Sequence, residues 1–186
     1  MRRLVVEPPM EECEAARWAT AAELAAAGRM PPRRRREYLA WRAMVRREVG
    51  ADARIAYDGA GAPVVENYPV HISVAHCRDR VAVLLSDARC AVDIEPVDRS
   101  VAGVTERFLT AAERALSDDP LFPLIAWCAK ETLYKYAGRK GLDLLRDLRI
   151  ERADPTGGKL TGRIRNGEPV ELTVRFDAGY AVVLIL

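Results

Sequence analysis

Lysine is scarce in this chain of 186 residues, although the chain is rich in charge. Of its 29 basic residues only four are lysine, which leaves 25 arginines, and 27 acidic residues bring the formal net charge to +2. The first 50 residues hold eleven Arg and seven Glu and no Lys. The nearly neutral total argues against a protein that acts mainly by binding nucleic acid. The four lysines are Lys130, Lys135, Lys140 and Lys159, so two of them lie five residues apart.

Histidine and cysteine are also few. The only histidines are His71 and His76, and no C-x-x-C spacing occurs. A zinc site built from Cys and His is therefore not expected, and scattered thiols favour reduced, buried cysteines over disulfides. The cysteines are Cys13, Cys77, Cys90 and Cys128.

Long apolar runs are absent, since no stretch approaches the roughly 20 residues that a membrane span requires. The start, Met1 to Val6 followed by Glu7-Pro8-Pro9, lacks the apolar centre and small-residue cleavage site of a signal peptide. With 49% apolar and 30% charged residues, the composition is that of a globular protein. We expect a cytoplasmic protein without a membrane partner.

The residue patterns predict helices and strands in alternation. Apolar residues at three- and four-residue steps, with Gly after the last of them, predict the longer helices. Alternating or β-branched runs between turn residues predict the strands. The expected helices are 11–27, 33–49, 101–118 and 121–137; the expected strands are Arg3–Val6, Val70–His76, Val81–Ser86 and Ala91–Glu95, with a loop over 58–69 and antiparallel strands from Leu148 onward.

An internal repeat appears at an offset of 100 residues. Ile72-Ser73-Val74 aligns with Leu172-Thr173-Val174, and Ala82–Leu85 aligns with Val182–Ile185. A helix with Ala-Trp-x-Ala, closed by Gly, precedes each pair. We therefore expect an α+β fold of two similar lobes, 1–88 and 89–186, each with a small antiparallel sheet and a long helix, and with an active site at their junction.

Two carboxylates stand two residues apart in Asp93-Ile94-Glu95. On a strand, residues i and i+2 project from the same face, so Asp93 and Glu95 would converge. Converging carboxylates repel, and a hard divalent cation such as Mg²⁺ is a common reason to tolerate them. For the D-x-E spacing alone, a solvent-facing strand end is the simpler explanation.

The helix over 121–137 carries Trp127, Glu131 and Lys135 at spacings of four, so the three side chains form one stripe. A Glu–Lys pair at this spacing is usually a surface ion pair. Since lysine is scarce, its presence here also suggests a compact charge for a phosphate oxygen. Glu131 would then complete a metal site begun by Asp93 and Glu95.

Three further features have structural explanations beside functional ones. His76 ends a strand and suits either a structural role or a phosphate contact. Glu113 with Thr110 fits a helix capping box, which explains it without catalysis. The run Arg33–Arg36 opposes the helix dipole at a helix start, so it suits an anionic ligand or a solvated face.

Together these segments resemble the 4′-phosphopantetheinyl transferase superfamily, in its long two-lobed, surfactin-synthetase-activating type. The two longest motifs are the specific ones, and the resemblance covers most of the chain. The matching segments are Gly61-Ala62-Pro63, Ile72–His76, Ala91–Glu95, Arg107-Phe108-Leu109 through Glu113, and Trp127-Cys128-Ala129-Lys130-Glu131 with Lys135, Gly138 and Gly141-Leu142.

The resemblance implies transfer of the 4′-phosphopantetheine arm of coenzyme A to a serine of an apo acyl or peptidyl carrier protein, with release of adenosine 3′,5′-bisphosphate. By resemblance, a monomer would hold Mg²⁺ at its acidic residues, and Glu131 or a metal-held water near it would take the serine proton. The implied catalytic residues are Glu131 and Lys135, the metal ligands Asp93, Glu95 and Glu131, and the coenzyme contacts His76, Ala75, Arg35, Arg36 and Lys135.

Two departures weaken the resemblance. Ala62 stands where the family usually has Lys, and Ala75 stands where Ser usually precedes the motif histidine. Each change removes a polar contact worth about 1–3 kcal/mol to a desolvated phosphate. The alternative is therefore a weak or inactive member that binds coenzyme A or a carrier protein without transfer.

Overall fold

The computed structural model describes residues 2–154 and 157–186 and has the mixed α+β architecture expected from the sequence. The chain divides into two compact units, Met1–Ala88 and Arg89–Leu186, and each is described by itself. The strands are β1 Arg2–Glu7, β2 Ile55–Tyr57, β3 Pro63–Val65, β4 His71–His76, β5 Val81–Ser86, β6 Ala91–Pro96, β7 Leu148–Asp154, β8 Lys159–Ile164, β9 Pro169–Asp177 and β10 Tyr180–Ile185. The helices are α1 Glu12–Ala15, η1 Ala16–Trp18, α2 Ala21–Ala27, α3 Pro32–Val49, η2 Ala102–Arg107, α4 Ala111–Arg114 and α5 Phe122–Ala137, where η marks a 3₁₀ helix.

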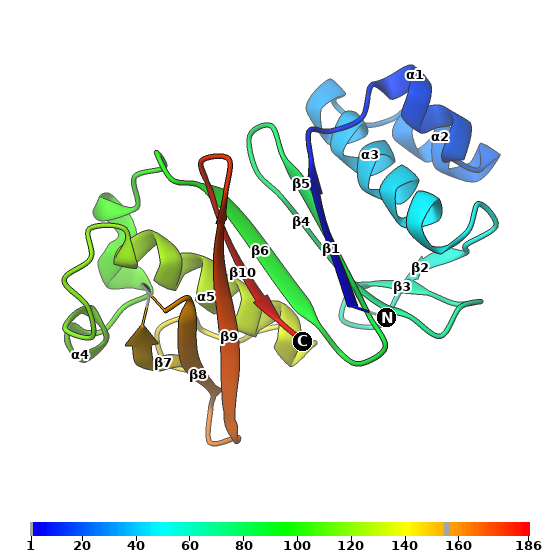
Figure 1. Ribbon diagram of the computed structural model, residues 1–186. Helices are drawn as coiled ribbons and strands as arrows, with labels where there is room; N and C mark the ends of the chain where they lie inside the picture. The colour runs from blue at the N-terminus through cyan, green and yellow to red at the C-terminus, as the bar shows by residue number, and fades with distance from the viewer. Residues whose placement is uncertain (1, 155–156) are drawn as a thin grey trace. The chain divides into compact units, whose positions relative to one another are not determined.

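The first unit packs the long helix α3 against an antiparallel sheet of order β1-β5-β4 (Figure 1). Proline suits the first turn of α3, because its missing N–H is not needed there. Trp41, Met44 and Val45 of α3 are buried against β5, where Val83 and Leu85 face them in one apolar cluster. The helix therefore forms because one of its faces completes the core.

The second unit packs α5 against a sheet of order β6-β10-β9-β8-β7 (Figure 1). Gly138 ends α5 in the left-handed conformation, with φ 61°, which a residue without Cβ adopts at low cost. Phe122, Ile125 and Leu133 of α5 are fully buried in the core of this unit. β6 and β10 lie under the middle of the helix, so side chains from the helix and β6 meet there.

The two sheets share a topology that matches the sequence repeat. In the first unit Val83 of β5 pairs with Val74 of β4. In the second unit Val183 of β10 pairs with Val174 of β9. Each residue of the second pair lies 100 positions after its counterpart in the first pair, which is the offset of the sequence repeat. The aligned hairpins therefore occupy equivalent places in their sheets.

The first strand of each unit also pairs in the same way. Val5 of β1 lies opposite Val83, and Asp93 of β6 lies opposite Val183. In both units a strand, a long helix and a hairpin follow in order, and the first strand pairs with the second strand of the hairpin. Asp93 and Val5 are therefore structural equivalents.

The sequence-based prediction of one helix over 11–27 is wrong. The segment folds as α1, η1 and α2, and Thr20 begins α2 with a capping box to Glu23. The hydroxyl of Thr20 accepts from the backbone N–H of Glu23, and the Glu23 carboxylate accepts from the Thr20 N–H. A box of this kind satisfies helix-start donors, so it stabilises a new start inside a segment of helix-forming residues.

The predicted helix over 101–118 is interrupted in the same way. Residues 102–107 form the 3₁₀ helix η2, and Thr110 then caps the short helix α4. The segment 58–69, predicted as a loop, contains β3, which pairs with β2. Asp58 closes their turn by accepting from the N–H groups of Ala60 and Ala62 at 2.9 and 2.8 Å.

The predicted helices 33–49 and 121–137 and the predicted strands Arg3–Val6, Val70–His76, Val81–Ser86 and Ala91–Glu95 are present to within one or two residues at their ends. Antiparallel strands follow from Leu148, as expected. Among the described residues, no helix combines the length and apolar character needed to cross a membrane.

Candidate active site

Three carboxylates of the second unit interact where β6 faces α5. Asp93 and Glu95 project from the same face of β6 and are only 8% and 9% exposed. Burial raises the pKa of the Glu131 carboxyl, and the negative charges of Asp93 and Glu95 raise it further, against the opposing charges of Lys135 and Arg99. We refer to Asp93, Glu95 and Glu131 as the carboxylate cluster.

Lys135 neutralises one member of the carboxylate cluster. Its ammonium donates to Asp93 Oδ1 at 2.8 Å and to the carbonyl of Val92 at 2.9 Å. The other oxygen, Asp93 Oδ2, is buried and has no hydrogen-bond partner among the residues that the structure describes. A buried carboxylate oxygen without a donor is costly, so this position suits a further cation or donor.

Glu95 is held by two neighbours. The indole N–H of Trp127 donates to Glu95 Oε1 at 3.2 Å, and the guanidinium of Arg99 forms an ion pair with the same oxygen. Arg99 also lies over the Trp127 ring, 5.2 Å from its centroid. Sequence reasoning missed Arg99, although a basic residue four positions after Glu95 was the available signal.

Trp127 connects the carboxylate cluster to the core. Its ring meets the ring of Phe108 edge-to-face, with centroids 5.1 Å apart. Phe108 is buried and comes from the segment between η2 and α4. This contact fixes the indole, and therefore the N–H that Glu95 accepts.

Lys130, the other scarce lysine of α5, points away from the carboxylate cluster. It is fully buried, its ammonium pairs with Glu113 Oε1 at 2.7 Å, and it donates to the carbonyl of Leu144. Burial lowers the pKa of Lys130, while the Glu113 carboxylate opposes this effect.

Glu113 stabilises the fold through two sets of contacts. It forms the capping box with Thr110 predicted from the sequence. It also accepts from the N–H of Ile150 at 2.9 Å, so one carboxylate joins α4, α5 and β7. The sequence did not pair Glu113 with Lys130, because the two residues are 17 positions apart and no pattern links them.

The candidate coenzyme contacts of the first unit gather at the start of α3. His76 Nδ1 lies 3.6 Å from Glu37 Oε2, and His76 Nε2 lies 3.4 Å from the guanidinium of Arg34. Ala75 is 3% exposed and precedes His76 on β4, so its methyl group projects from the opposite face of the strand.

Each arginine of the run Arg33–Arg36 has an acidic partner. Arg35 pairs with Glu12 at 2.9 Å, and Arg36 pairs with Glu11 at 3.2 Å. Arg33 and Arg34 both pair with Glu37, at 2.9 and 4.0 Å. The basic excess of this segment is therefore partly offset by its own neighbours.

A cavity of about 320 Å³ lies beside this run in the first unit. Its lining combines basic and acidic side chains with prolines and a buried cysteine. The lining residues are Pro9, Glu12, Pro32, Arg33, Arg36, Glu37, Cys77, Arg78, Arg80 and Val81.

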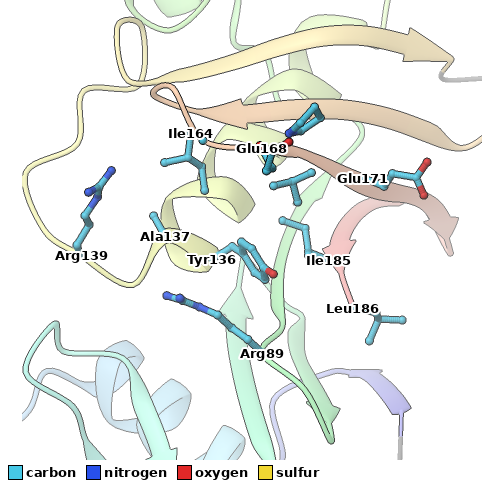
Figure 2. Close-up of a pocket in the computed structure, with 12 residues that line it drawn as sticks. Arg89, Tyr136, Ala137, Arg139, Ile164, Glu168, Glu171, Ile185 and Leu186 are labelled. Atoms are coloured by element: carbon cyan, nitrogen blue, oxygen red, sulfur yellow. The ribbon is translucent and has the colours of Figure 1, made fainter.

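A larger cavity, of about 610 Å³, lies at the carboxyl end of α5 in the second unit (Figure 2). Tyr136 and Ala137 line it, directly after Lys135 in the helix, and Arg89 lies over the Tyr136 ring at 5.3 Å. Ile164 and Ile185 supply apolar lining. Since no member of the carboxylate cluster lines this cavity, it adjoins the acidic site along the helix without containing it.

The donors of the carboxylate cluster suit a hard divalent cation in kind. Mg²⁺ prefers carboxylate oxygens, and the unpartnered Asp93 Oδ2 is such a donor. Over residues 2–154 and 157–186, however, no three His, Cys, Asp or Glu side chains are arranged as metal ligands. Instead, Lys135 and Arg99 pair with Asp93 and Glu95.

An α+β unit in which buried carboxylates meet a lysine between a strand and a helix has the groups that phosphate chemistry uses. A family model described as the 4′-phosphopantetheinyl transferase superfamily matches residues 89–184, more than half of the chain. The chain therefore belongs to that superfamily. Its members are transferases that use coenzyme A as a substrate and carrier proteins as partners. A comparison with curated proteins found no match.

Proposed function

We propose that this protein transfers the 4′-phosphopantetheine arm of coenzyme A to a serine of an acyl or peptidyl carrier protein. The serine Oγ attacks the β-phosphorus of the coenzyme diphosphate, and the bond from that phosphorus to the bridging oxygen breaks. Adenosine 3′,5′-bisphosphate leaves. The observation that carries the proposal is the carboxylate cluster beside Lys135, in a unit that matches the superfamily over almost its whole length.

Glu131 is the proposed acceptor of the serine proton. In the metal-free protein, burial and the neighbouring charges of Asp93 and Glu95 raise the pKa of its carboxyl. Since a bound Mg²⁺ would lower its basicity, Glu131 would take the proton either directly or through a neighbouring water. Its place on α5, one turn before Lys135, sets the base close to a cation.

Lys135 is the proposed contact to the phosphate oxygens. Its ammonium already lies 2.8 Å from Asp93, so a phosphate arriving here would share or replace that partner. A compact ammonium stabilises the negative charge that develops on the oxygens of the diphosphate during transfer.

Asp93, Glu95 and Glu131 are the proposed Mg²⁺ ligands. Bound there, Mg²⁺ would stabilise negative charge on the diphosphate oxygens as a Lewis acid. The unpartnered Asp93 Oδ2 supports the assignment, because a cation would compensate it.

In the first unit, His76, Arg35 and Arg36 are the proposed contacts to the remaining phosphates. Arg35 and Arg36 lie near the N-terminus of α3, which begins at Pro32, and the helix dipole at this end also favours an anion. Ala75 adds only its backbone, since a methyl group offers no hydrogen bond.

The long two-lobed type of the superfamily is the proposed subtype. The matching topologies of the two sheets support it, because one chain then carries both copies of the repeat. We accordingly propose a monomer. The four free cysteines agree with the proposed cytoplasmic location, where thiols stay reduced.

The proposal is tested by incubating the protein with coenzyme A, Mg²⁺ and a panel of apo carrier proteins. The intact mass of each carrier protein is then measured by mass spectrometry. We expect at least one carrier to gain the mass of the arm, and Glu131→Gln to lose this activity. Glu106→Gln is a matched control in the same unit, because Glu106 is exposed and outside the carboxylate cluster. Coenzyme binding without modification of any carrier would instead favour a binding protein, the reading suggested by Ala62 and Ala75.

A further inference from the structure

Arg99 pairs with the carboxylate of Glu95, which would have to be available in order to bind a metal ion. Its guanidinium pairs with Glu95 Oε1, the same oxygen that accepts from Trp127. With Arg99 in this place, Glu95 already carries a compensating positive charge. Among the described residues no three His, Cys, Asp or Glu side chains are arranged as metal ligands, and here Arg99 pairs with Glu95 and Lys135 with Asp93.

The side chain of Arg99 is held less firmly than the side chain of Glu95, with which it pairs. It lies beyond the end of β6, and its N–H donates to the carbonyl of Pro96 in a turn. Its side chain is 40% exposed, whereas that of Glu95 is 11% exposed. An exposed arginine pairs with a carboxylate only modestly, so the guanidinium can leave while Glu95 stays.

The charges at the site also leave room for an incoming cation. The carboxylate cluster has three carboxyl groups, against which stand the guanidinium of Arg99 and the ammonium of Lys135. Asp93 Oδ2 remains without a donor. A divalent cation that displaces Arg99 from Glu95 would compensate both Glu95 and Asp93.

We propose that Arg99 competes with Mg²⁺ for Glu95 and, once displaced, binds the diphosphate of coenzyme A. The proposal rests on the proposed function and adds a residue that the superfamily motifs in this sequence do not contain. A guanidinium presents several N–H donors in one plane, which matches phosphate oxygens. Arg99 would therefore oppose the metal alone and favour the metal together with the coenzyme.

The competition predicts opposite effects of one substitution on two ligands. In Arg99→Gln, Mg²⁺ alone should bind about tenfold more tightly, since Glu95 is no longer occupied. Coenzyme A, at saturating Mg²⁺, should bind about tenfold more weakly, since a charged contact is lost. A residue with a purely structural role would instead weaken both.

Isothermal titration of the metal-stripped full-length protein with MgCl₂, and then with coenzyme A, measures both affinities. Arg114→Gln is the matched control, because Arg114 has the same 40% exposure and pairs with Glu106 of the same unit. Asp93→Asn should abolish Mg²⁺ binding and so identifies the site being titrated.

Tryptophan fluorescence gives a second readout. Displacement of Arg99 removes a cation from the Trp127 ring, so Mg²⁺ should change the emission of the wild type more than that of Arg99→Gln, in which only the contact of Trp127 with Glu95 can change. Trp18 and Trp41 lie in the first unit and are present in both proteins.

The outcomes separate this proposal from the proposed function. Equal Mg²⁺ affinity in the wild type and in Arg99→Gln, with binding abolished by Asp93→Asn, would overturn the competition and leave the metal site intact. Mg²⁺ binding by Arg99→Gln alone would support the competition strongly. No Mg²⁺ binding by either protein would overturn the metal site and the competition together.

Discussion

Glu131 illustrates how a residue proposed to act in catalysis can oppose folding. Burial, followed by the charge of Asp93, raises the pKa of its carboxyl. The ionised form is therefore disfavoured in the folded protein, and this cost grows as pH rises from the ordinary pKa of 4.5 through the raised one. The cost is fully present once the pH lies above the raised pKa.

Glu131→Gln should for this reason stabilise the metal-free protein while abolishing transfer. We expect a gain on the order of 1 kcal/mol at pH 7, which disappears in acid, where the wild-type carboxyl is protonated. Urea denaturation in the presence of a chelator at pH 7 and pH 4 measures it. Glu106→Gln, the exposed control, should change little, and an equal gain in both variants would contradict the account of Glu131.

At the scale of elements, a buried charge cluster joins α2 to α3 in the first unit. Glu23 accepts from Arg46 through both carboxylate oxygens, at 2.8 and 3.0 Å, and from Arg42 at 3.2 Å. Arg42 also lies over the rings of Tyr38 and Trp41. The box that starts α2 thus uses the same glutamate that pairs with the long helix.

Glu23 should make the stability of the first unit depend on pH. Burial acts to raise the pKa of Glu23, but hydrogen bonds from Arg46 and the Thr20 N–H and the arginine charges outweigh it, so the pKa is lowered. Such a group contributes stability above its ordinary pKa of 4.5, which is lost as pH falls through the folded value.

Glu23→Gln should therefore cost about 3 kcal/mol at pH 7, because it leaves two buried guanidinium groups without a carboxylate. The difference from the wild type should shrink below pH 4.5. Chemical denaturation at several pH values, followed by circular dichroism, checks this. A difference independent of pH would show that lost packing, rather than charge, causes the effect.

The Lys130–Glu113 pair plays the corresponding role in the second unit, where it joins α4, α5 and β7. Lys130→Met should destabilise the protein by about 3 kcal/mol, since the Glu113 carboxylate stays buried. Adding Glu113→Gln should recover part of this loss in a double-mutant cycle. Additive losses in the double variant would mean that the two groups do not interact.

The long elements were predictable because their apolar patterns extend over many residues. The breaks at Thr20 and Thr110 depend on single side chains that cap a new helix, and helix propensity around them concealed the first break. The sequence predicts the capping box of Thr110 and Glu113, but the helix predicted over 101–118 continues through both residues. The contact of Lys130 with Glu113 could not be placed, because it is set by tertiary packing.

The candidate site was predictable in part. The sequence singled out Asp93, Glu95, Glu131 and Lys135, and the structure brings these into mutual electrostatic contact. From the sequence, the run Arg33–Arg36 suits an anionic ligand or a solvated face, whereas in the structure each of these arginines has an acidic neighbour. Neighbours supplied by another segment, such as Glu11 and Glu12, follow from the fold and not from local pattern.

At the scale of the whole molecule, the carboxylate cluster of the second unit has no acidic counterpart at the equivalent described positions of the first unit. Val5 of the first unit is the sheet equivalent of Asp93. When Trp41 of α3 is aligned with Trp127 of α5, Val45 takes the position that is equivalent to Glu131. Val5 and Val45 belong to the apolar core of the first unit. The first unit thus uses for packing the positions that carry charge in the second.

This asymmetry predicts one Mg²⁺ per chain. Titration of the metal-stripped protein should give a stoichiometry of about one, as one set of hard oxygen donors implies. Val5→Asp should not create a second site, because the equivalents of Glu131 and Lys135 remain apolar. A stoichiometry near two in the wild type would contradict the assignment of the carboxylate cluster as the single site.

The central claim is that the carboxylate cluster catalyses arm transfer. The most direct measurement quantifies, in one reaction, the carrier protein that gains the arm and the adenosine 3′,5′-bisphosphate that is released. The account predicts equal amounts of the two products with wild-type protein and Mg²⁺, and neither product with Asp93→Asn or with a chelator. Equal product formation by Asp93→Asn and the wild type would contradict it.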